Sequence, residues 1–169
     1  MTIRYCRSRG FDRPSEVLPE AEALSRRQVY RVHLRGDQVD RAEYLQEGAV
    51  ARVIYVRAAP LDAELLAAHR AAYGAIDFDI DTPQRAHDGL RTQARHQYDK
   101  DGVQRRFSET SIDARGNLVR EVLGVSGPQT IIEYEHNENH VLLRSVHKLA
   151  DGTVTEIYDW LADARLGMI

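Results

Sequence analysis

Short turn segments rich in glycine, asparagine and aspartate divide the second half of this chain at close intervals. Gly102, Gly116 and Gly127 lie 14 and 11 residues apart, which leaves room for one strand and its turn between neighbours. These residue types tolerate the positive φ that tight hairpin turns need. Parallel strands would require crossovers of a dozen or more residues, and almost none are available. The spacing therefore predicts an antiparallel meander.

The segments between the turns alternate between apolar and polar residues. In residues 129–136, Thr130, Ile132 and Tyr134 share one side, and Glu133 and Glu135 share the other. A period of two is typical of a sheet with one buried and one wetted face. With single exceptions, the same alternation occurs in three further segments, namely 28–34, 49–57 and 153–160. Together with 118–123 and 141–148, which are apolar on both sides, the pattern predicts about eight or nine strands.

Residues 61–73 predict the one main helix. The stretch is rich in strong helix formers, and Gly74 is suited to end it. The stripe expected to pack on the sheet consists of Leu61, Leu65, Ala68 and Ala72. A second, shorter helix is expected over 19–26. The predicted fold class is therefore α+β and mostly antiparallel β, with the helix packed on the meander in a single domain over 1–169.

Composition excludes several classes of protein. The chain has 169 residues, of which 43% are hydrophobic and 29% charged, as in ordinary globular domains. No apolar run is long enough to cross a membrane, and the N-terminus does not read as a secretory signal. The single cysteine, Cys6, cannot form an internal disulfide. A net charge of −3 argues against nucleic-acid binding. We therefore expect a soluble cytoplasmic protein.

Two turn segments resemble those of a known repeat family. Residues 98–103, Tyr-Asp-Lys-Asp-Gly-Val, and residues 113–119, Asp-Ala-Arg-Gly-Asn-Leu-Val, are similar to the Tyr-Asp-x-x-Gly-x-Leu hairpins of the Rhs/YD-repeat family. The resemblance covers about residues 97–160. In that family the aspartate and glycine shape the turn, and the aromatic residue packs on the neighbouring strand. The resemblance implies local hairpin geometry here and no activity.

Acidic residues are the first candidates for a functional surface. Asp77, Asp79 and Asp81 occur at every second position and share one side of an extended segment. Clustered carboxylates can bind a hard cation or tune one another's pKa, but their alternation is also typical of the exposed face of an edge strand. A second acidic group follows on the predicted hairpin, with Glu133, Glu135 and Glu138. We expect both groups to bind a partner protein with a basic surface.

A metal or catalytic site has little support in the sequence. His136 and His140 flank the 137–139 turn, where a hairpin would bring two metal ligands together, with Glu138 or His147 as a third. Polar residues at an exposed turn explain the same pattern. The chain has no nucleophile elbow, dinucleotide fingerprint or phosphate loop. We therefore expect no metal, no cofactor and no catalytic residue.

Three classes of function remain open. In the first, the protein is a small binding module, such as an immunity-type protein that neutralises a toxin through its acidic surface. In the second, the strands form a barrel-like protein, or an enzyme, that holds a small ligand in an aromatic cavity. The residues that would line this cavity are Tyr30, Tyr44, Tyr55, Tyr134, Tyr158 and Trp160. In the third, the chain is a structural subunit of a larger assembly, homo-oligomers included.

Overall fold

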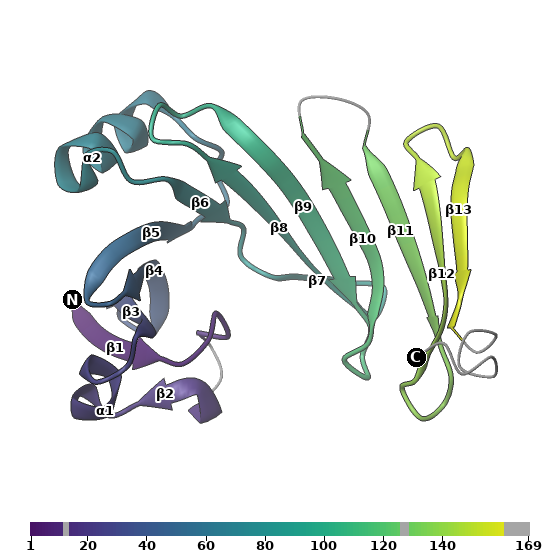
Figure 1. Ribbon diagram of the computed structural model, residues 1–169, viewed down its shortest axis with the longest axis horizontal. Coiled ribbons are helices and arrows are strands. Elements are labelled where there is room, and N and C mark those ends of the chain that lie inside the picture. The colour runs from purple at the N-terminus through teal and green to yellow at the C-terminus, as the bar shows by residue number, and fades with distance from the viewer. Residues whose placement is uncertain (12–13, 126–128, 161–169) are drawn as a thin grey trace. The chain divides into compact units, whose positions relative to one another are not determined.

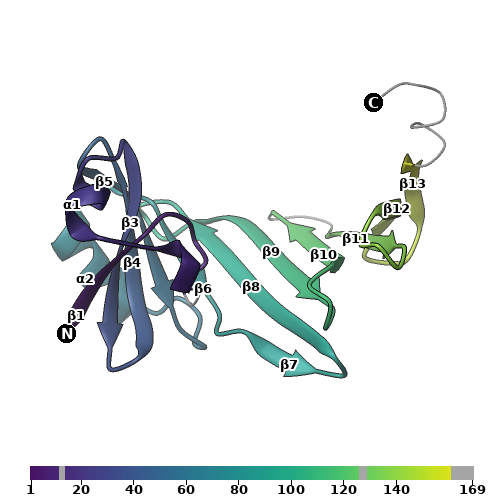
Figure 2. The same cartoon turned by 90° about the horizontal axis from the view of Figure 1, so that it is seen from below.

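A computed structural model describes residues 1–11, 14–125 and 129–160 (Figures 1 and 2). It contains thirteen strands and two α-helices. The strands pair antiparallel in β1–β2, β1–β3, β3–β4, β4–β5, β7–β8, β9–β10, β10–β11, β11–β12 and β12–β13, and parallel in β5–β6. The mostly antiparallel meander is thus confirmed, with more strands than the eight or nine expected. The elements are β1 (Thr2–Cys6), β2 (Val17–Leu18), α1 (Glu20–Leu24), β3 (Gln28–Arg35), β4 (Gln38–Gln46), β5 (Ala49–Val56), α2 (Ala63–Tyr73), β6 (Phe78–Asp81), β7 (Arg85–His87), β8 (Leu90–Tyr98), β9 (Gln104–Ile112), β10 (Leu118–Gly124), β11 (Thr130–His136), β12 (Leu142–Leu149) and β13 (Val154–Asp159).

The chain divides into two compact units. The first consists of residues 1–83 and 96–103, and we call it the layered unit. The second consists of residues 84–95 and 104–169, and we call it the meander unit. The expectation of one domain over 1–169 stays a prediction, because compactness alone does not show which parts fold independently.

The layered unit contains the one parallel pair of strands. Its strand order is β2-β1-β3-β4-β5-β6, and β6 runs parallel to β5 with Val53 opposite Phe78. Parallel neighbours need a long crossover, and the chain between β5 and β6 provides one that contains α2. The sequence left room for almost no such crossovers, and the one that the structure contains is formed by the predicted main helix.

Helix α2 ends at Tyr73, as the sequence predicts, and begins at Ala63, two residues after the predicted start at Leu61. The Asp62 side chain accepts a hydrogen bond from the Leu65 backbone N–H at 2.7 Å, and Gly74 follows with a φ of 63°. The predicted packing stripe is only partly right, because Ala68 and Ala72 are exposed. The side chains that pack toward the sheet are the larger ones at neighbouring helical positions, namely Leu65, Leu66, His69 and Tyr73.

Buried apolar residues of the layered unit form three clusters. One lies around α1 and consists of Leu18, Ala23, Val29 and Leu45. A second consists of Cys6, Phe11, Val32, Leu34, Ala42 and Ile54. The third lies beneath α2 and consists of Val53, Phe78, Ile80 and Tyr98. Helix α1 is shorter than the predicted 19–26, because after Leu24 the backbone N–H groups of Ser25 and Arg26 bond only three residues back, to Glu22 and Ala23.

The meander unit is built from strands and their turns over its described residues. β7 pairs with β8, and β9 to β13 follow in sequence order, as the green and yellow strands of Figure 1 show. Residues that lie directly opposite each other share a face of the sheet. One such row contains Ile132, His147 and Glu156, and another contains Glu133, Val146 and Ile157.

Three hairpin turns share one geometry, one in the layered unit and two in the meander unit. In the turns at Asp99 and Asp113, the aspartate side chain accepts two backbone N–H groups, and a glycine with positive φ occupies the fourth position. In the turn at Asn137, the fourth position is His140, with a φ of 64°. The predicted turns at Gly102 and Gly116 are confirmed, whereas Gly127 lies outside the described residues.

Candidate functional site

The three aspartates near β6 are not an exposed face. Strand β6 lies between β5 and β8, so the interpretation as an edge strand is wrong. Asp79 is completely buried and Asp81 is 3% exposed, whereas the Asp77 side chain is 48% exposed. Only Asp77 of the three is thus open to a partner.

Two arginines neutralise the buried aspartates. Arg9 donates two hydrogen bonds to Asp81, at 2.9 and 3.1 Å, and its Nη2 also lies 2.8 Å from Asp79. Arg52 donates to the other oxygen of Asp79 at 2.6 Å. Buried carboxylates require such partners. These contacts hold the segment around Arg9 against β5 and β6, which is a structural role.

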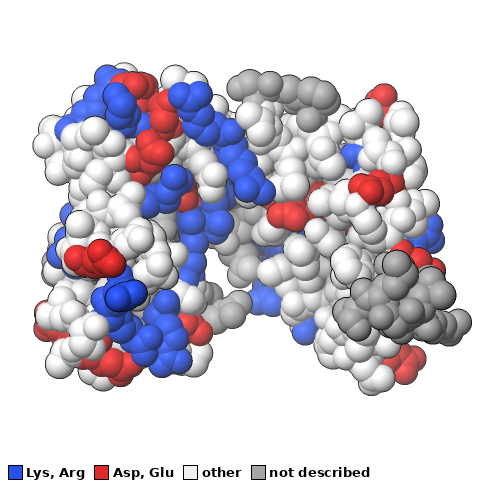
Figure 3. All heavy atoms as spheres, in the orientation of Figure 1, with Lys and Arg blue, Asp and Glu red and all other residues white. Residues whose placement is uncertain are grey.

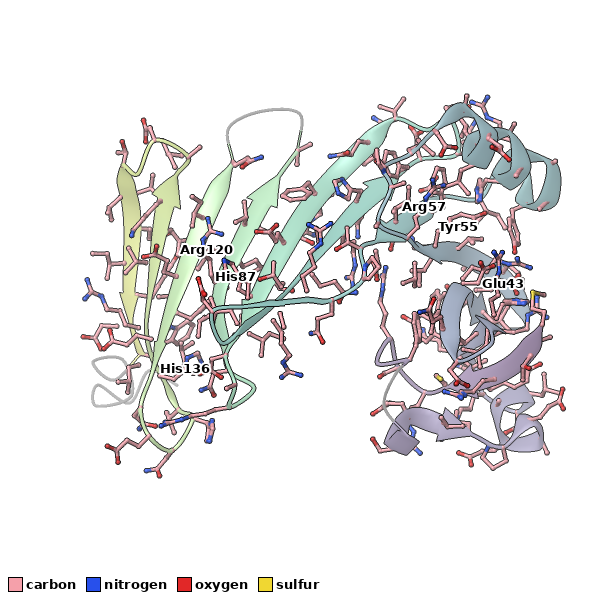
Figure 4. The ribbon with its side chains drawn as sticks, turned by 180° about the vertical axis from the view of Figure 1, so that it is seen from behind. Glu43, Tyr55, Arg57, His87, Arg120 and His136 are labelled. Atoms are coloured by element: carbon pink, nitrogen blue, oxygen red, sulfur yellow. The ribbon has the colours of Figure 1, made fainter. Side chains whose placement is uncertain are left out.

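Glu43 is the centre of a buried polar cluster that the sequence did not reveal. The residue is 4% exposed and lies on β4 opposite Val53 of β5, two residues before Tyr55 on that strand (Figure 4). Arg31 donates to its Oε2 at 2.5 Å, and the Tyr73 hydroxyl donates to its Oε1 at 2.6 Å. His33 Nε2 lies 3.2 Å from Oε2. The cluster therefore joins β3, β4 and the last turn of α2.

The donors around Glu43 set its ionisation. Burial alone would raise the pKa of Glu43, but the contacts of Tyr73, His33 and Arg31 outweigh burial and lower the pKa. Burial and the neighbouring Glu43 carboxylate both raise the pKa of Tyr73. Glu43 is therefore held as a carboxylate and Tyr73 as a hydrogen-bond donor, which fixes the end of α2 to the sheet.

A second polar contact lies beneath the middle of α2. His69 is completely buried, its Nε2 lies 2.7 Å from the Ile76 carbonyl oxygen, and its Nδ1 lies 3.0 Å from the Tyr55 hydroxyl. A carbonyl can only accept, so Nε2–H donates to Ile76 and Tyr55 donates to Nδ1. Burial raises the pKa of Tyr55 to about 12, so its hydroxyl stays a donor at neutral pH. Both ring nitrogens of His69 are thus satisfied.

The alternation in residues 28–34 places Arg31 and His33 on the polar side of the strand, which we expect to be wetted, and this expectation hides the Glu43 cluster. That assignment is wrong for His33, which is buried, and Arg31 is only about a third exposed. The signal that could have revealed it is the amphipathic helix of residues 61–73, because its apolar side must cover one face of the sheet. Polar groups on the covered face then need partners of opposite charge.

The second acidic group lies on the meander unit. Glu133 and Glu135 lie on one face of β11, and Glu138 lies in the exposed turn that follows. Lys148 donates to Glu133 at 2.5 Å, and Glu135 lies opposite Arg144. All three residues thus lie on the surface, and Glu133 and Glu135 each have a basic neighbour.

Charge is unevenly distributed along the meander unit. Residues of β7, β8 and β9 that belong to it, with the turns between them, include five arginines and only two acidic residues. Basic side chains gather over β8 and β9 in Figure 3. From Asp113 to Trp160 there are eight acidic residues and four basic ones. The unit therefore has a basic side and an acidic side.

The last strand exposes large apolar side chains. Every residue of β13 is exposed, with Val154 at 49%, Ile157 at 50% and Tyr158 at 38%. Trp160, directly after the strand, is 38% exposed and contacts the Tyr158 ring at a centroid distance of 6.1 Å. Neighbouring apolar exposure of this kind marks interaction sites more often than scattered single residues do.

Of the two histidines proposed as metal ligands, His140 forms part of the turn itself, and His136 lies just before it. His140 has the positive φ of the turn, and its Nδ1 lies 2.7 Å from the Asn117 side-chain oxygen. His136 is the last residue of β11, before the turn (Figure 4). Over the described residues, no group of three or more His, Cys, Asp and Glu side chains is arranged to hold a metal ion.

The aromatic residues proposed to line one cavity lie in separate places. Tyr30 packs on Tyr44 and Phe11, Tyr55 packs on Phe78, and Tyr158 packs on His147. A pocket of about 310 Å³ does occur in the layered unit, beside β1 and β2. It is lined by Thr2, Ile3, Arg4, Tyr5, Val17, Leu18, Glu20 and Leu34, of which only Tyr5 is aromatic.

Comparison with protein-family models, curated proteins and solved structures finds no match for this chain. None of the helices over the described ranges combines the length and the apolar character that a membrane crossing requires.

Proposed function

We propose that this chain is a protein-binding module whose docking surface is the acidic side of the meander unit. The observation that carries the proposal is β13, a strand in which all six residues are exposed, with three large apolar side chains and Trp160 directly after it. The acidic residues of this side include Glu133, Glu135 and Glu138. Asp79 and Asp81 are no longer part of the proposed surface, because they are buried and paired.

Physical chemistry supports this combination of apolar and acidic groups. Exposed apolar side chains gain free energy when a partner covers them, at about 25 cal/mol per Å² of apolar area. The excess of acidic residues from Asp113 to Trp160 adds long-range attraction toward a basic partner and speeds association. The proposed partner is therefore a protein with a basic surface. In the immunity form of this proposal, the partner is a cytoplasmic toxin with a basic surface.

The proposal is tested with a variant in which Glu133, Glu135 and Glu138 are all changed to lysine. The wild type and this variant are used side by side to capture proteins from cell extract, and the captured partner is then purified. Association rates are measured by stopped flow at low and at high ionic strength. We expect the reversal to slow association by at least about tenfold at low ionic strength, and by much less at high ionic strength.

A matched control separates the docking surface from overall charge. Replacing Glu20, Glu22 and Glu64 by lysine changes the net charge by the same amount but alters only exposed positions of the layered unit. This control should associate within about twofold of the wild type. Equal slowing by both triple variants, or no slowing by either, would contradict the proposed surface.

A further inference from the structure

The pocket of about 310 Å³ in the layered unit lies where the sheet loses a strand. β1 pairs with β3 along its whole length, from Thr2 to Cys6, but β2 pairs with β1 only at Tyr5 and Cys6. After Leu18 the chain leaves the sheet through Pro19 and enters α1 (Figure 1). The pocket therefore lies along the part of β1 that β2 does not reach.

The backbone of Ile3 directs its hydrogen-bonding groups toward this pocket. Arg7 N–H donates to the Glu16 carbonyl oxygen at 2.8 Å, so the backbone groups of Arg7 face the β2 side. In an antiparallel pair every second residue does the same, which places the N–H and C=O groups of Tyr5 and Ile3 on that side as well. Tyr5 lies opposite Leu18, but no strand of the described chain lies opposite Ile3 there. One N–H and one C=O group of β1 are therefore available to a ligand.

The side chains around the pocket provide both charges and an apolar surface. Arg4 and Glu20 line it, and neither forms an ion pair with another side chain over the described ranges. Ile3 and Val17 line it as well, and both are exposed apolar residues. The volume is at the lower end of the range of small-ligand sites, about 300–1,000 Å³. The pocket thus combines a backbone edge, a cation, an anion and an apolar wall, which is the set of groups that a short peptide presents in complementary form.

We propose that this pocket binds a short peptide by its free amino end. The peptide continues the path that β2 leaves, so it runs antiparallel to β1 with its first residue opposite Ile3. The ammonium of that residue donates to the Ile3 carbonyl oxygen, and its own carbonyl oxygen accepts from Ile3 N–H. The turn from Leu18 into α1 occupies the space before this position, so a bound chain must begin here. Glu20, the first residue of α1, provides the carboxylate for the ammonium.

The lining side chains also define the first two residues of the peptide. Residues that lie directly opposite each other share a face, so the first residue of the peptide meets Ile3 and is apolar. The second lies opposite Thr2, on the face that also carries Arg4, and is therefore acidic. Later residues lead away from the pocket and contribute little. This site lies in the layered unit and does not rest on the function proposed for the meander unit.

Isothermal titration calorimetry of the full chain with three peptides tests the chemistry of the ligand. The first peptide is Val-Glu-Thr-Thr with a free amino end and an amidated carboxyl end. The second is the same peptide with an acetylated amino end, and the third is Val-Lys-Thr-Thr with the ends of the first. We expect the first to bind and the other two to bind at least about tenfold more weakly, because one loses the ammonium and the other brings a cation to Arg4.

The position of the ligand is tested with the ¹⁵N-labelled chain and two variants. The first peptide should shift the amide of Ile3 and slow its hydrogen exchange, whereas the amide of Arg4 faces β3 and should gain no protection. Glu20→Gln should weaken binding by about tenfold. Glu22→Gln makes the same change at an exposed position of α1 that does not line the pocket, and it should leave binding within about twofold.

Several outcomes would overturn the inference. Equal binding of the free and the acetylated peptide would show that the amino end is not recognised. Tighter binding of an acetylated peptide with a free carboxylate would show that the opposite end of a chain docks beside Arg4. Equal weakening by Glu20→Gln and Glu22→Gln, an unchanged Ile3 amide, or no heat of binding from any of the peptides would place the ligand elsewhere or remove it.

Discussion

A comparison of strand β6 with strand β13 shows how the two units differ. All four residues of β6 are buried, whereas all six residues of β13 are exposed. β6 has strands on both sides and α2 over one face, while β13 has one neighbouring strand and no helix in its unit over the described residues. The comparison teaches that an alternating sequence pattern defines faces but not burial, which depends on the elements that cover those faces.

The units also differ in how they hold charge. In the layered unit, Asp79 and Glu43 are buried and have arginine partners. In the meander unit, Glu133 and Lys148 form a pair that is partly open to solvent. Removing a partner from a buried carboxylate is costly, whereas an exposed ion pair contributes little. The same interaction is thus expected to stabilise one unit far more than the other.

The largest expected effect breaks the core of the layered unit. Phe78→Ala should lower the free energy of unfolding of that unit by about 4 kcal/mol, because the ring is completely buried between Tyr98 and His69. Ile157→Ala should cost less than about 1 kcal/mol, since half of that side chain is already exposed. Urea unfolding followed by hydrogen exchange in each unit measures both. Similar losses would contradict the difference in burial.

A slightly smaller effect is expected from removing an arginine. Arg9→Leu should cost about 3 kcal/mol, because Asp79 and Asp81 are left buried with fewer donors. Lys148→Leu, the matched change beside Glu133, should cost about 0–1 kcal/mol. Both are measured by urea unfolding at neutral pH. If Arg9→Leu is neutral, the Arg9 contacts do not hold the segment to β6.

The smallest effect concerns pH. The folded-state pKa of Glu43 is below its ordinary value of 4.5, so its contacts stabilise the fold above that pH, and this stability is lost as the pH falls through the lowered pKa. Glu43→Gln should therefore cost roughly 2 kcal/mol at pH 7 and show a shallower loss of stability in acid. Unfolding measured across a pH series tests this. Glu133→Gln, at a half-exposed carboxylate, serves as the control and should change the free energy of unfolding at pH 7 by less than about 1 kcal/mol.

The sequence predicted the elements whose signals are local. The α2 helix followed from its helix-forming residues and from Gly74, and the hairpins followed from turns such as Asp113–Asn117, in which the side chain organises its own backbone. The faces of β11 also followed from alternation. These features depend on contacts within a few residues, which a single sequence records.

Features that depend on distant contacts could not be predicted in this way. The parallel pairing of β5 and β6 and the burial of Asp79 both result from segments that meet only in the fold, such as Arg9 and β6, 70 or more residues apart in sequence. His140 has a positive φ at the turn position that glycine occupies in the turns at Gly102 and Gly116. Because histidine is not a typical residue for this conformation, the sequence carried no sign of its role in the turn. The exposure of β13 could not be predicted either, because it depends on whether another element packs on the strand, and the strand's own residues do not record this.

The position of Trp160 has a practical consequence. It is the only tryptophan of the chain, and it lies directly after β13 beside Tyr158. Intrinsic fluorescence excited at long wavelength therefore reports on one end of the meander unit and is silent on the layered unit. A blue shift of the emission when a ligand is added would be a label-free optical signal of water leaving that end of the molecule.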